Sequence, residues 1–410
     1  MNILIVSQYF WPENFRINDV VKTLTEKGHI VDVLTGKPNY PDGDIFSDYS
    51  VWGTSKQVWN NSTLYRIPLI PRGKKSTLRL IANYLSFVIF GVLLGPWLLR
   101  KKRYDVIFVY GVSPILKAIP AIFLSWFKKC PSVIWVQDLW PESLEATGYV
   151  QNKHILGVVG SLVRWIYRHV DLLLVQSHAF VKQVSQMSAN IPVLYYPNSV
   201  DTSFSKPANI LVPESSILDN GFSILFAGNV GTAQAVETIV EAANLLKEYQ
   251  DINFVILGSG SRLEWMKEQV IQRQLKNLHL LGRFPVETMP TFMQKASSLL
   301  VSLTEQPIFT MTVPNKVQAY MASGKPILAC LNGEGARVVT EAKAGISISA
   351  EDAHGLADAI LKLYQMSDQQ RDEIGENGRC YYKTHYDHEM LVEQLIEHFK
   401  NASDLYKRSK

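Results

Sequence analysis

The stretch Thr304–Cys330 combines a loop, a helix start and a positive charge in an arrangement suited to binding an anion. An apolar run, Leu299–Leu303, precedes the loop and predicts a buried strand. Pro314 then predicts the first turn of a helix, because proline is favoured there. Backbone N–H groups and the helix dipole attract anions at such an end, and Lys316 adds a full charge that does not favour the helix itself. We expect a diphosphate to bind here; an ordinary βαβ unit with a surface lysine is the alternative.

Two carboxylates, Asp138 and Glu142, follow the apolar run Ser132–Gln137, which predicts another buried strand. Ligands of doubly wound sheets bind beyond the carboxyl ends of the strands, so both acids are candidate catalytic residues. Asp138 is the stronger candidate because it directly follows the strand. Both acids also suit the first turn of a helix, where negative charge favours the dipole, so a structural role stays open.

Two further loops lie at predicted strand ends. Asn14 and Arg16 stand in the loop after the apolar run Asn2–Ser7, where Arg16 is expected either to contact a phosphate or to form a surface ion pair. A glycine turn, Gly228–Thr232, follows the apolar run Phe222–Ala227 and can bind phosphate through backbone N–H groups. Taken alone, such a turn is a weak signal.

The elements that position these residues need more than one domain. The chain has 410 residues, of which 47% are hydrophobic and 19% charged, and this fits two or three globular domains. Strand-like and helix-like segments alternate, which predicts a doubly wound α/β sheet in each half. We place a first domain at residues 1–200, a linker rich in Ser, Pro and Asn at 201–220, a second domain at 221–386 and a final helical segment at 387–410.

Composition excludes several classes of protein. The net charge of +4 is too small to argue for nucleic-acid binding. Cys130, Cys330 and Cys380 are scattered, which predicts a reducing compartment and neither a structural metal nor a disulfide framework. The N-terminus lacks a basic region and a small-residue cleavage site, so we expect it to form the first strand rather than a signal peptide.

The most apolar stretch, Leu80–Leu99, is about as long as a membrane-spanning helix. Basic residues flank both of its ends, whereas a span normally has one basic flank. We therefore expect the stretch to lie on an anionic cytoplasmic membrane surface without crossing it; a core helix with solvated charged ends is the alternative. The flanking residues are Arg72, Lys74, Lys75 and Arg79 before the stretch, and Arg100, Lys101, Lys102 and Arg103 after it.

Five motifs resemble the retaining glycosyltransferases of family 4, in the subgroup that builds bacterial surface polysaccharides. They are TVPNK with MASGKP (312–316 and 321–326), GNVG (228–231), GRF (282–284), DLWPES (138–143) and PNYP (38–41). The resemblance extends over nearly the whole chain. It implies the GT-B fold, in which two Rossmann-like domains face each other across a cleft and the C-terminal helix, here 387–410, returns to the N-terminal domain.

The resemblance also implies a set of residues that bind a nucleotide-sugar donor. In this chain they are Asn229, Gly231, Thr232, Arg283, Phe284, Thr312, Asn315, Lys316 and Gln318. Two glutamates of the family are replaced by Met311 and Ala319, so Gln318 or a backbone group is expected to take over the contact to the ribose. The family's Arg and Lys beside the glycine turn are replaced by Asn229 and Gln234, so Lys316 and Arg283 are expected to compensate.

The activity implied is transfer of a sugar from a UDP-sugar to a polyprenyl-diphosphate-linked saccharide in O-antigen or capsule synthesis. N-acetyl-L-fucosamine is our first choice of sugar, because the resemblance extends to transferases for that sugar. The UDP-sugar is a co-substrate, with no cofactor and no metal expected, and the enzyme would act at the cytoplasmic face of the inner membrane. A UDP-sugar epimerase on the same fold would need paired carboxylates and no membrane segment. A sugar-binding protein without activity would normally carry a signal peptide.

Overall fold

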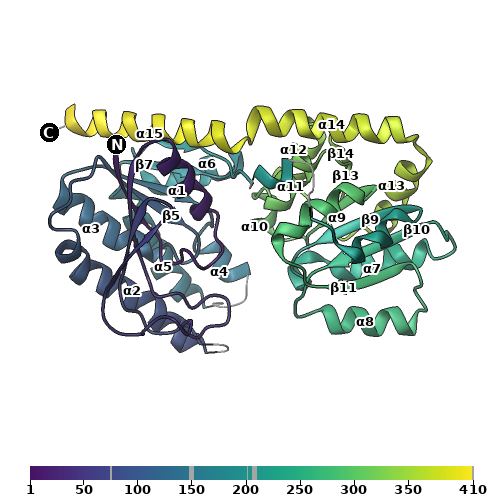
Figure 1. Ribbon diagram of the computed structural model, residues 1–410, viewed down its shortest axis with the longest axis horizontal. Helices are drawn as coiled ribbons and strands as arrows, with labels where there is room; N and C mark the ends of the chain where they lie inside the picture. Colours follow the sequence, from purple (N-terminus) through teal and green to yellow (C-terminus); the bar gives the residue numbers. More distant parts are fainter. Residues whose placement is uncertain (74–75, 147–151, 201, 206–209, 409–410) are drawn as a thin grey trace. The chain divides into compact units, whose positions relative to one another are not determined.

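The computed structural model describes residues 1–410 except 74–75, 147–151, 201, 206–209 and 409–410. The chain folds into two compact units (Figure 1). Unit 1 comprises Met1–Pro197 and Glu389–Lys410, and unit 2 comprises Asn198–His388. Lys74 and Lys75 of the expected basic flank, and residues 201 and 206–209 of the expected linker, lie outside the described residues.

Unit 1 is built on an eight-stranded sheet in the order β3-β4-β2-β1-β5-β6-β7-β8. Its strands are β1 (Asn2–Val6), β2 (Ile30–Thr35), β3 (Ser55–Trp59), β4 (Ser62–Arg66), β5 (Val106–Gly111), β6 (Ser132–Val136), β7 (Leu172–Val175) and β8 (Val193–Tyr195). All neighbours pair in parallel except β3 and β4, which form an antiparallel hairpin at one edge. The strand order reverses between β1 and β5, and doubly wound sheets bind ligands at such a reversal.

The sequence predicted the central strands of unit 1 but not its edge hairpin. The strands on which the candidate loops depend are confirmed as β1 and β6. In β3, intermediate and exposed residues alternate and carry Lys and Gln, so no buried apolar run marks it as a strand.

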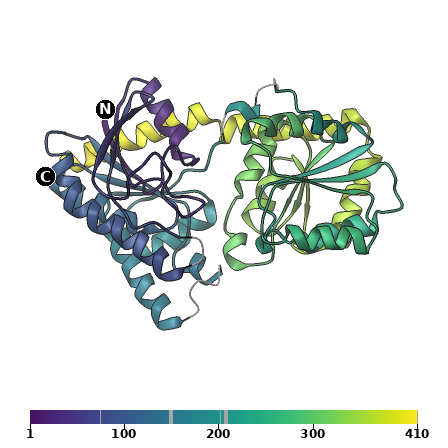
Figure 2. The same cartoon turned by 60° about the horizontal axis from the view of Figure 1, so that its bottom comes forward.

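Helices cover both faces of this sheet. They are α1 (Ile17–Glu26), α2 (Thr77–Leu98), α3 (Ala118–Lys128), α4 (Glu142–Ala146), α5 (Lys153–Arg168), α6 (His178–Ser188) and α15 (His388–Arg408). On one face α1 and α15 share a core with β1 and β5, and the rings of Phe108 and Phe399 meet at 5.1 Å. Val33 of β2 joins that core, whereas its neighbour Leu34 reaches Gly95 of α2 on the other face. The helix expected at 387–410 thus packs on unit 1, as both views of α15 in yellow show (Figures 1 and 2).

Unit 2 is built on a six-stranded parallel sheet in the order β11-β10-β9-β12-β13-β14. Its strands are β9 (Phe222–Ala227), β10 (Ile252–Leu257), β11 (Leu278–Gly282), β12 (Ser298–Ser302), β13 (Ile327–Cys330) and β14 (Gly345–Ile348). Its helices are α7 (Val236–Leu245), α8 (Leu263–Gln272), α9 (Met289–Lys295), α10 (Pro307–Thr310), α11 (Asn315–Ser323), α12 (Glu334–Glu341), α13 (Ala353–Gln365) and α14 (Asp368–His385). Here the order reverses between β9 and β12, so the loops that follow these two strands are the ones expected to bind a ligand.

The segment expected to be a linker belongs largely to unit 2. Its described part contains 3-10 helices at Thr202–Ser205 and Pro213–Asp219, and Val212 and Leu218 are buried in the core of that unit. The Ser- and Pro-rich composition suggested a solvated connection, but two apolar residues are enough to fix this segment against the sheet layer. The chain therefore passes from unit 1 to unit 2 at Pro197–Asn198, slightly before the predicted end of the first domain at residue 200.

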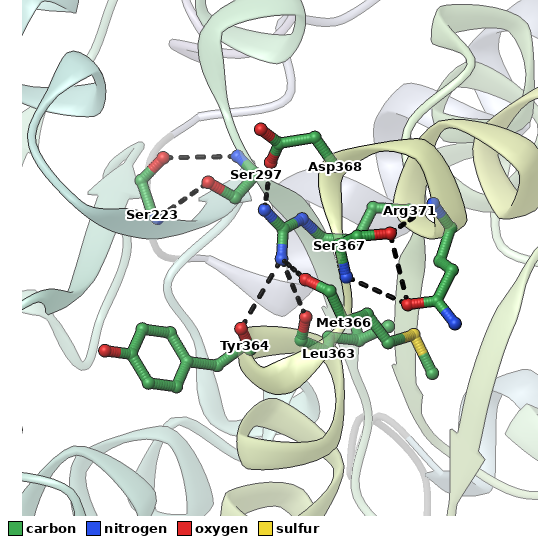
Figure 3. A network of polar contacts seen from close by, with 9 residues as sticks. Ser223, Ser297, Leu363, Tyr364, Met366, Ser367, Asp368 and Arg371 are labelled. Carbon is green, nitrogen blue, oxygen red and sulfur yellow. Dashed lines mark hydrogen bonds and ion pairs between the residues drawn. The ribbon is translucent and has the colours of Figure 1, made fainter.

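The end of α13 is held by a single arginine (Figure 3). Arg371 donates to the carbonyl oxygens of Leu363 and Met366, and it forms an ion pair with Asp368. Its guanidinium also lies 5.4 Å from the centroid of the Phe222 ring on β9. One side chain thus satisfies the free carbonyls of α13 and fixes its turn into α14 against the sheet.

Candidate active site

The site in unit 2 is built where the glycine turn after β9 meets the start of α11. Lys316, in the first turn of α11, lies directly across Gly228: a Cβ atom on Gly228 would stand 2.5 Å from Cε and 2.8 Å from Nζ of Lys316. Gly228 also has a φ of +143°, which L residues rarely adopt. Only glycine allows the lysine to cross the turn at this distance. The two predicted anion-binding parts therefore come together.

Lys316 is a poorly compensated cation. Its Nζ lies 3.8 Å from the centroid of the Phe226 ring, and in the described part of the chain no carboxylate forms an ion pair with it. Burial lowers the pKa of Lys316 to about 7, because enclosure disfavours the charged ammonium. An anion bound at the turn would restore that charge. The predicted helix start is confirmed, but Pro314 has an extended backbone and is the N-cap residue of α11 rather than part of its first turn. The helix is followed by Gly324 in the left-handed conformation.

The glycine turn after β9 packs against the loop after β10. A Cβ atom on Gly258 would overlap the carbonyl group of Gly228, so residue 258 must be glycine for the two loops to meet. The backbone N–H of Val230 donates to Ser259 O at 2.9 Å. The N–H of Val230 is therefore already used and does not point to a ligand.

The two residues that replace the family's charged pair bind each other. Asn229 Nδ2 donates to Gln234 Oε1 at 3.0 Å, and the backbone N–H of Gly231 donates to the same oxygen at 3.2 Å. The predicted contact from the Gly231 N–H to a phosphate is thus occupied by a side chain in this structure. Asn229 and Thr232 are exposed at the edge of the turn. The turn itself carries no charged side chain, so Lys316 supplies the positive charge.

The other predicted residues of α11 and of the loop before it differ in how far they are exposed to solvent. Asn315 is exposed at the first position of the helix, and Thr312 Oγ1 donates to Phe309 O at 3.1 Å. Gln318 is fully buried, and neither of its amide atoms has a hydrogen-bond partner among the described residues. Ala319 lies in the apolar core. The side chain of Gln318 is thus enclosed in this structure, and the expectation that Gln318 or a backbone group contacts the ribose stays a prediction.

Arg283 and Phe284 follow β11, an edge strand of the sheet that is separated from β9 by β10. Arg283 is exposed, and the Phe284 ring packs edge-on against Phe292 at 4.9 Å. The backbone N–H of Gly258 donates to Gly282 O at 2.7 Å, which joins this loop to the one behind the glycine turn. Arg283 thus lies beyond the carboxyl end of the sheet, as Lys316 does, but it follows β11, which is two strands away from β9 and its glycine turn.

In unit 1, Asp138 lies beyond β6 in a defined orientation. Its Oδ2 accepts hydrogen bonds from the backbone N–H of Ser113 at 2.6 Å and from Ser113 Oγ at 2.8 Å. Trp140 Nε1 donates to the same Ser113 Oγ at 2.9 Å. These partners belong to the loop after β5 and not to α4, so the structure does not show Asp138 as a helix cap. Asp138 is partly exposed, and its Oδ1 accepts no hydrogen bond from the described residues.

Glu142, the other predicted acid, is held differently. Its Oε1 accepts a hydrogen bond from Gln183 Nε2 of α6 at 2.6 Å, and its Oε2 is buried. Glu142 stands in the first turn of α4, where an acid favours the helix dipole. These contacts fit the structural alternative for Glu142 better than a catalytic role.

The loop after β1 contains a functional candidate that the sequence did not reveal. Asn14 is exposed, and Arg16 is the partly exposed N-cap residue of α1. Glu13, between two loop residues, is almost completely buried and accepts backbone hydrogen bonds from Phe10 at 3.1 Å, and from Asn39 and Tyr40 at 2.8 Å each. Burial raises the pKa of Glu13 to about 7. Glu13 joins the PNYP loop to the first loop.

Helix α2 presents its apolar side to solvent. It is the helix, among the described residues, with the length and apolar composition to cross a membrane, and most of its surface is not buried in unit 1. The face that packs inward carries small and polar residues together with one phenylalanine: Asn83, Ser86, Phe87, Gly91 and Gly95. The outer face carries side chains exposed by 47% to 79%: Leu78, Ile81, Leu85, Ile89, Leu93 and Trp97.

Two doubly wound domains are the architecture of the GT-B fold, and solved structures with that fold match the chain over nearly its whole length. Sucrose-phosphate synthase from Thermosynechococcus elongatus superposes with a TM-score of 0.74 at 16% identity, covering 98% of each chain. Anabaena HepE, solved with UDP and glucose, gives 0.65 at 13% identity, covering 97% of this chain and 99% of HepE. At these identities the likeness establishes the fold.

The family follows from sequence comparison. A model described as "Glycosyl transferase 4-like domain" matches residues 14–198, and one described as "Glycosyl transferases group 1" matches residues 221–366. The chain belongs to the family 4 glycosyltransferases. It is 25% identical to the putative colanic acid biosynthesis glycosyl transferase WcaI of Escherichia coli K12, over 79% of this chain and 82% of WcaI. It is 27% identical to the probable glycosyltransferase WbjE of Pseudomonas aeruginosa, over 72% of this chain and 75% of WbjE.

Proposed function

We propose that this glycosyltransferase moves a sugar from a nucleoside diphosphate sugar, with retention of configuration, to a polyprenyl-diphosphate-linked saccharide. The observation that carries the donor class is Lys316 lying across the glycine turn, with its charge uncompensated, at the reversal of the strand order in unit 2. The start of α11 and this ammonium stabilise the diphosphate as negative charge develops on it during bond cleavage.

Asp138 is the residue of unit 1 that we propose to act on the acceptor hydroxyl. Its Oδ2 is fixed by Ser113 while its other oxygen is left for a ligand. A carboxylate in this state accepts the proton of an acceptor hydroxyl as that oxygen attacks the sugar. Donor chemistry is thus assigned to the loops at the strand-order reversal of unit 2. Acceptor chemistry is assigned to the loop after β6 of unit 1, which is held by Ser113 of the loop after β5.

UDP is the nucleotide we propose. Anabaena HepE and an Escherichia coli trehalose-6-phosphate protein of the same fold were solved with UDP or a UDP-sugar. The proposed pathway is O-antigen or capsule synthesis, supported by the name of WcaI, and N-acetyl-L-fucosamine is the first sugar to test. An epimerase would change the sugar without an acceptor, so the product distinguishes the two reactions.

A membrane surface is the partner we propose for unit 1, on the cytoplasmic face of the inner membrane. The outer face of α2 is apolar, and the neighbouring helix α3 adds the exposed aromatic residues Phe123, Trp126 and Phe127. α2 packs closely on α3, because a Cβ atom on Gly91 would stand 2.8 Å from Pro120. Contiguous apolar surface of this kind marks an interaction site, and a lipid-linked acceptor would be presented there.

The donor class is tested by thermal unfolding of the purified protein with a panel of UDP- and GDP-sugars. Ligand binding to the folded state raises the unfolding midpoint in proportion to the logarithm of ligand concentration. We expect UDP-sugars to raise the midpoint and Lys316→Ala to abolish most of the rise. A panel in which no nucleotide sugar shifts the midpoint of the wild type would refute the proposed donor class.

A further inference from the structure

Arg72 is a partly exposed cation of unit 1, in the segment between β4 and α2. Its guanidinium lies over the Tyr40 ring, with 5.3 Å between Cζ and the ring centroid. In the described part of the chain no carboxylate forms an ion pair with it. By contrast the buried Arg66, at the end of β4, donates to the carbonyl oxygens of Gly36 and Trp11. The fold thus uses the guanidinium of Arg66 and leaves the charge of Arg72 for a ligand.

The PNYP loop fixes the position of Arg72. The backbone N–H of Arg72 donates to Asn39 Oδ1 at 3.3 Å, and Asn39 is completely buried. The ring under the guanidinium belongs to the next residue of the loop, Tyr40, and packs on Phe15 with 5.2 Å between ring centroids. A single carboxylate oxygen, Glu13 Oε1, accepts from the backbone N–H groups of both Asn39 and Tyr40 at 2.8 Å. Both contacts of Arg72 are therefore held by the same buried acid.

This place belongs to the surface on which we expect the acceptor. The loops after β1, β2, β4 and β5 lie at the carboxyl edge of the sheet, because these strands run in parallel. The Tyr9 ring, in the loop after β1, lies 5.7 Å from the Tyr40 ring and 5.5 Å from Lys117 Nζ. Lys117 is buried without a hydrogen-bond partner for Nζ among the described residues, in the connection after β5 that also carries Ser113, the partner of Asp138. Direct contacts thus join the loop of Tyr40 to those around Asp138.

The segment between β4 and α2 is also bonded to the inner face of that helix. The backbone N–H of Ile70 donates to Ser86 Oγ at 3.0 Å, and Asn83 Nδ2 donates to Ile70 O at 2.6 Å. A Cβ atom on Gly73 would stand 2.9 Å from Cδ of Arg79, so a second cation lies beside the segment. The outer face of α2 is apolar and exposed. An anion bound here would lie next to the surface that we propose to dock on the membrane.

We propose that Arg72 binds the diphosphate of the lipid-linked acceptor. The inference rests on the proposed function, in which the acceptor is a polyprenyl-diphosphate-linked saccharide. A guanidinium presents its N–H groups in a planar fork that fits two phosphate oxygens at once, which makes arginine suited to this group. The diphosphate joins the lipid to the sugar, so its site should lie between the membrane and the reacting hydroxyl. The lipid is then assigned to α2, the diphosphate to Arg72 and the hydroxyl to Asp138.

The test is binding of farnesyl diphosphate, a soluble short-chain polyprenyl diphosphate, by isothermal titration calorimetry in the presence of saturating UDP. UDP fills the proposed donor site, so the titration reports a second site. We expect the wild type to bind farnesyl diphosphate more tightly than farnesol, which lacks the diphosphate, and more tightly than inorganic diphosphate, which lacks the lipid. Arg72→Gln should weaken binding of farnesyl diphosphate by about tenfold or more, because charge-assisted hydrogen bonds are lost. It should leave the affinity for farnesol and the unfolding midpoint unchanged.

Three further variants separate binding from packing. Tyr40→Phe keeps the ring under the guanidinium and should bind farnesyl diphosphate as the wild type does, whereas Tyr40→Ala should weaken it. Lys56→Gln is the matched control, because Lys56 is an exposed cation of unit 1 that lies 5.9 Å from the centroid of another tyrosine ring, Tyr65 of β4. This control should leave the affinity unchanged.

The outcomes distinguish this inference from the proposed function. Equal affinities of wild type and Arg72→Gln for farnesyl diphosphate would overturn the role of Arg72. Farnesyl diphosphate that binds only by displacing UDP would place the diphosphate in the donor site and would overturn it as well. An equal loss of Arg72→Gln on phosphatidylglycerol vesicles and on farnesyl diphosphate would show a general site for phospholipid headgroups instead. None of these results changes the midpoint shift by UDP-sugars, which tests the donor class separately.

Discussion

At the level of single residues, we expect the donor chemistry to depend on one cation, Lys316. The family's charged pair is replaced by Asn229 and Gln234, which bind each other, and Lys316 lies across the same turn from α11. In this chain the positive charge beside the turn therefore comes from the neighbouring helix α11. A site with one such charge should respond strongly to its removal.

We predict that Lys316→Ala weakens binding of a UDP-sugar by about tenfold or more, because one charge-assisted hydrogen bond contributes about 1.5–3 kcal/mol. The unfolding midpoint without ligand should not fall, since the wild-type ammonium is poorly compensated. Isothermal titration calorimetry measures the affinity. Lys295→Ala is the matched control, because Lys295 pairs with Asp219 at 2.7 Å and lies before β12, at the opposite edge of the sheet. Equal affinities for wild type and Lys316→Ala would remove Lys316 from the site.

The lowered pKa of Lys316 makes donor binding pH-dependent. In the free enzyme the ammonium loses its proton as the pH rises through about 7, so above that value binding of a diphosphate must take up a proton. We predict that affinity is nearly constant just below pH 7 and falls by up to about tenfold per pH unit above it. Titration in buffers of different ionisation enthalpy measures the proton uptake. The Lys316→Ala variant should show neither the slope nor the uptake; a slope that persists in the variant would assign the titration to another group.

Some of these residues could be predicted from the sequence and others could not. Lys316 was predictable because its place depends on a local pattern, a proline followed by a helix. The burial of Glu13 and Lys117 was not predicted, because a charged residue in a loop or at a helix start is normally exposed to solvent. Their burial is produced by chain segments far away in sequence: Asn39 and Tyr40 enclose Glu13, and the Tyr9 ring covers Lys117.

At the level of elements, the turn after β9 and the start of α11 act as one unit. We predict that Gly228→Ala weakens UDP-sugar binding about as much as Lys316→Ala, because the added methyl group displaces the lysine. The unfavourable φ should also lower the unfolding midpoint, at a cost of about 1–3 kcal/mol. Gly28→Ala is the control: Gly28 has a φ of +81° and open space around its Cβ position, so it carries the strain without touching the site. Gly228→Ala that loses stability but keeps its affinity would show that the turn and the lysine are independent.

Elements differ in how far the sequence determines them. The buried strands β1, β6, β9 and β12 follow from short apolar runs, which in parallel sheets are enclosed on both faces. The α2 helix was expected from its apolar run, but not the direction of its faces. That direction is decided by Gly91 and Gly95, which let α2 approach α3 and β2 closely, so the bulky residues turn outward.

At the scale of the whole molecule, we expect α2 and its surroundings to determine where the enzyme works. The outer face of α2 meets water along its whole length, and basic residues stand at both ends of the helix: Arg79 at the start, and Arg100, Lys101 and Arg103 after the end. Lys102 forms an ion pair with Asp32 at 3.1 Å and serves the fold as well. A surface with an apolar centre and basic ends matches an anionic bilayer in both respects.

We predict that the protein sediments with vesicles containing anionic lipid and that high salt releases part of it. Each Lys or Arg near the surface contributes about 1 kcal/mol of attraction, which salt screens, whereas the apolar contribution of α2 persists until detergent is added. Replacing Leu85, Leu93 and Trp97 with Ser should reduce the salt-resistant part, and replacing Lys101 and Arg103 with Gln should reduce the salt-sensitive part. Ile271→Ser, at a residue 77% exposed on α8 of unit 2, is the control and should bind as the wild type does. Equal binding to neutral and anionic vesicles that neither set of changes reduces would show that α2 is not the docking surface, and a water-borne acceptor would then be the better candidate.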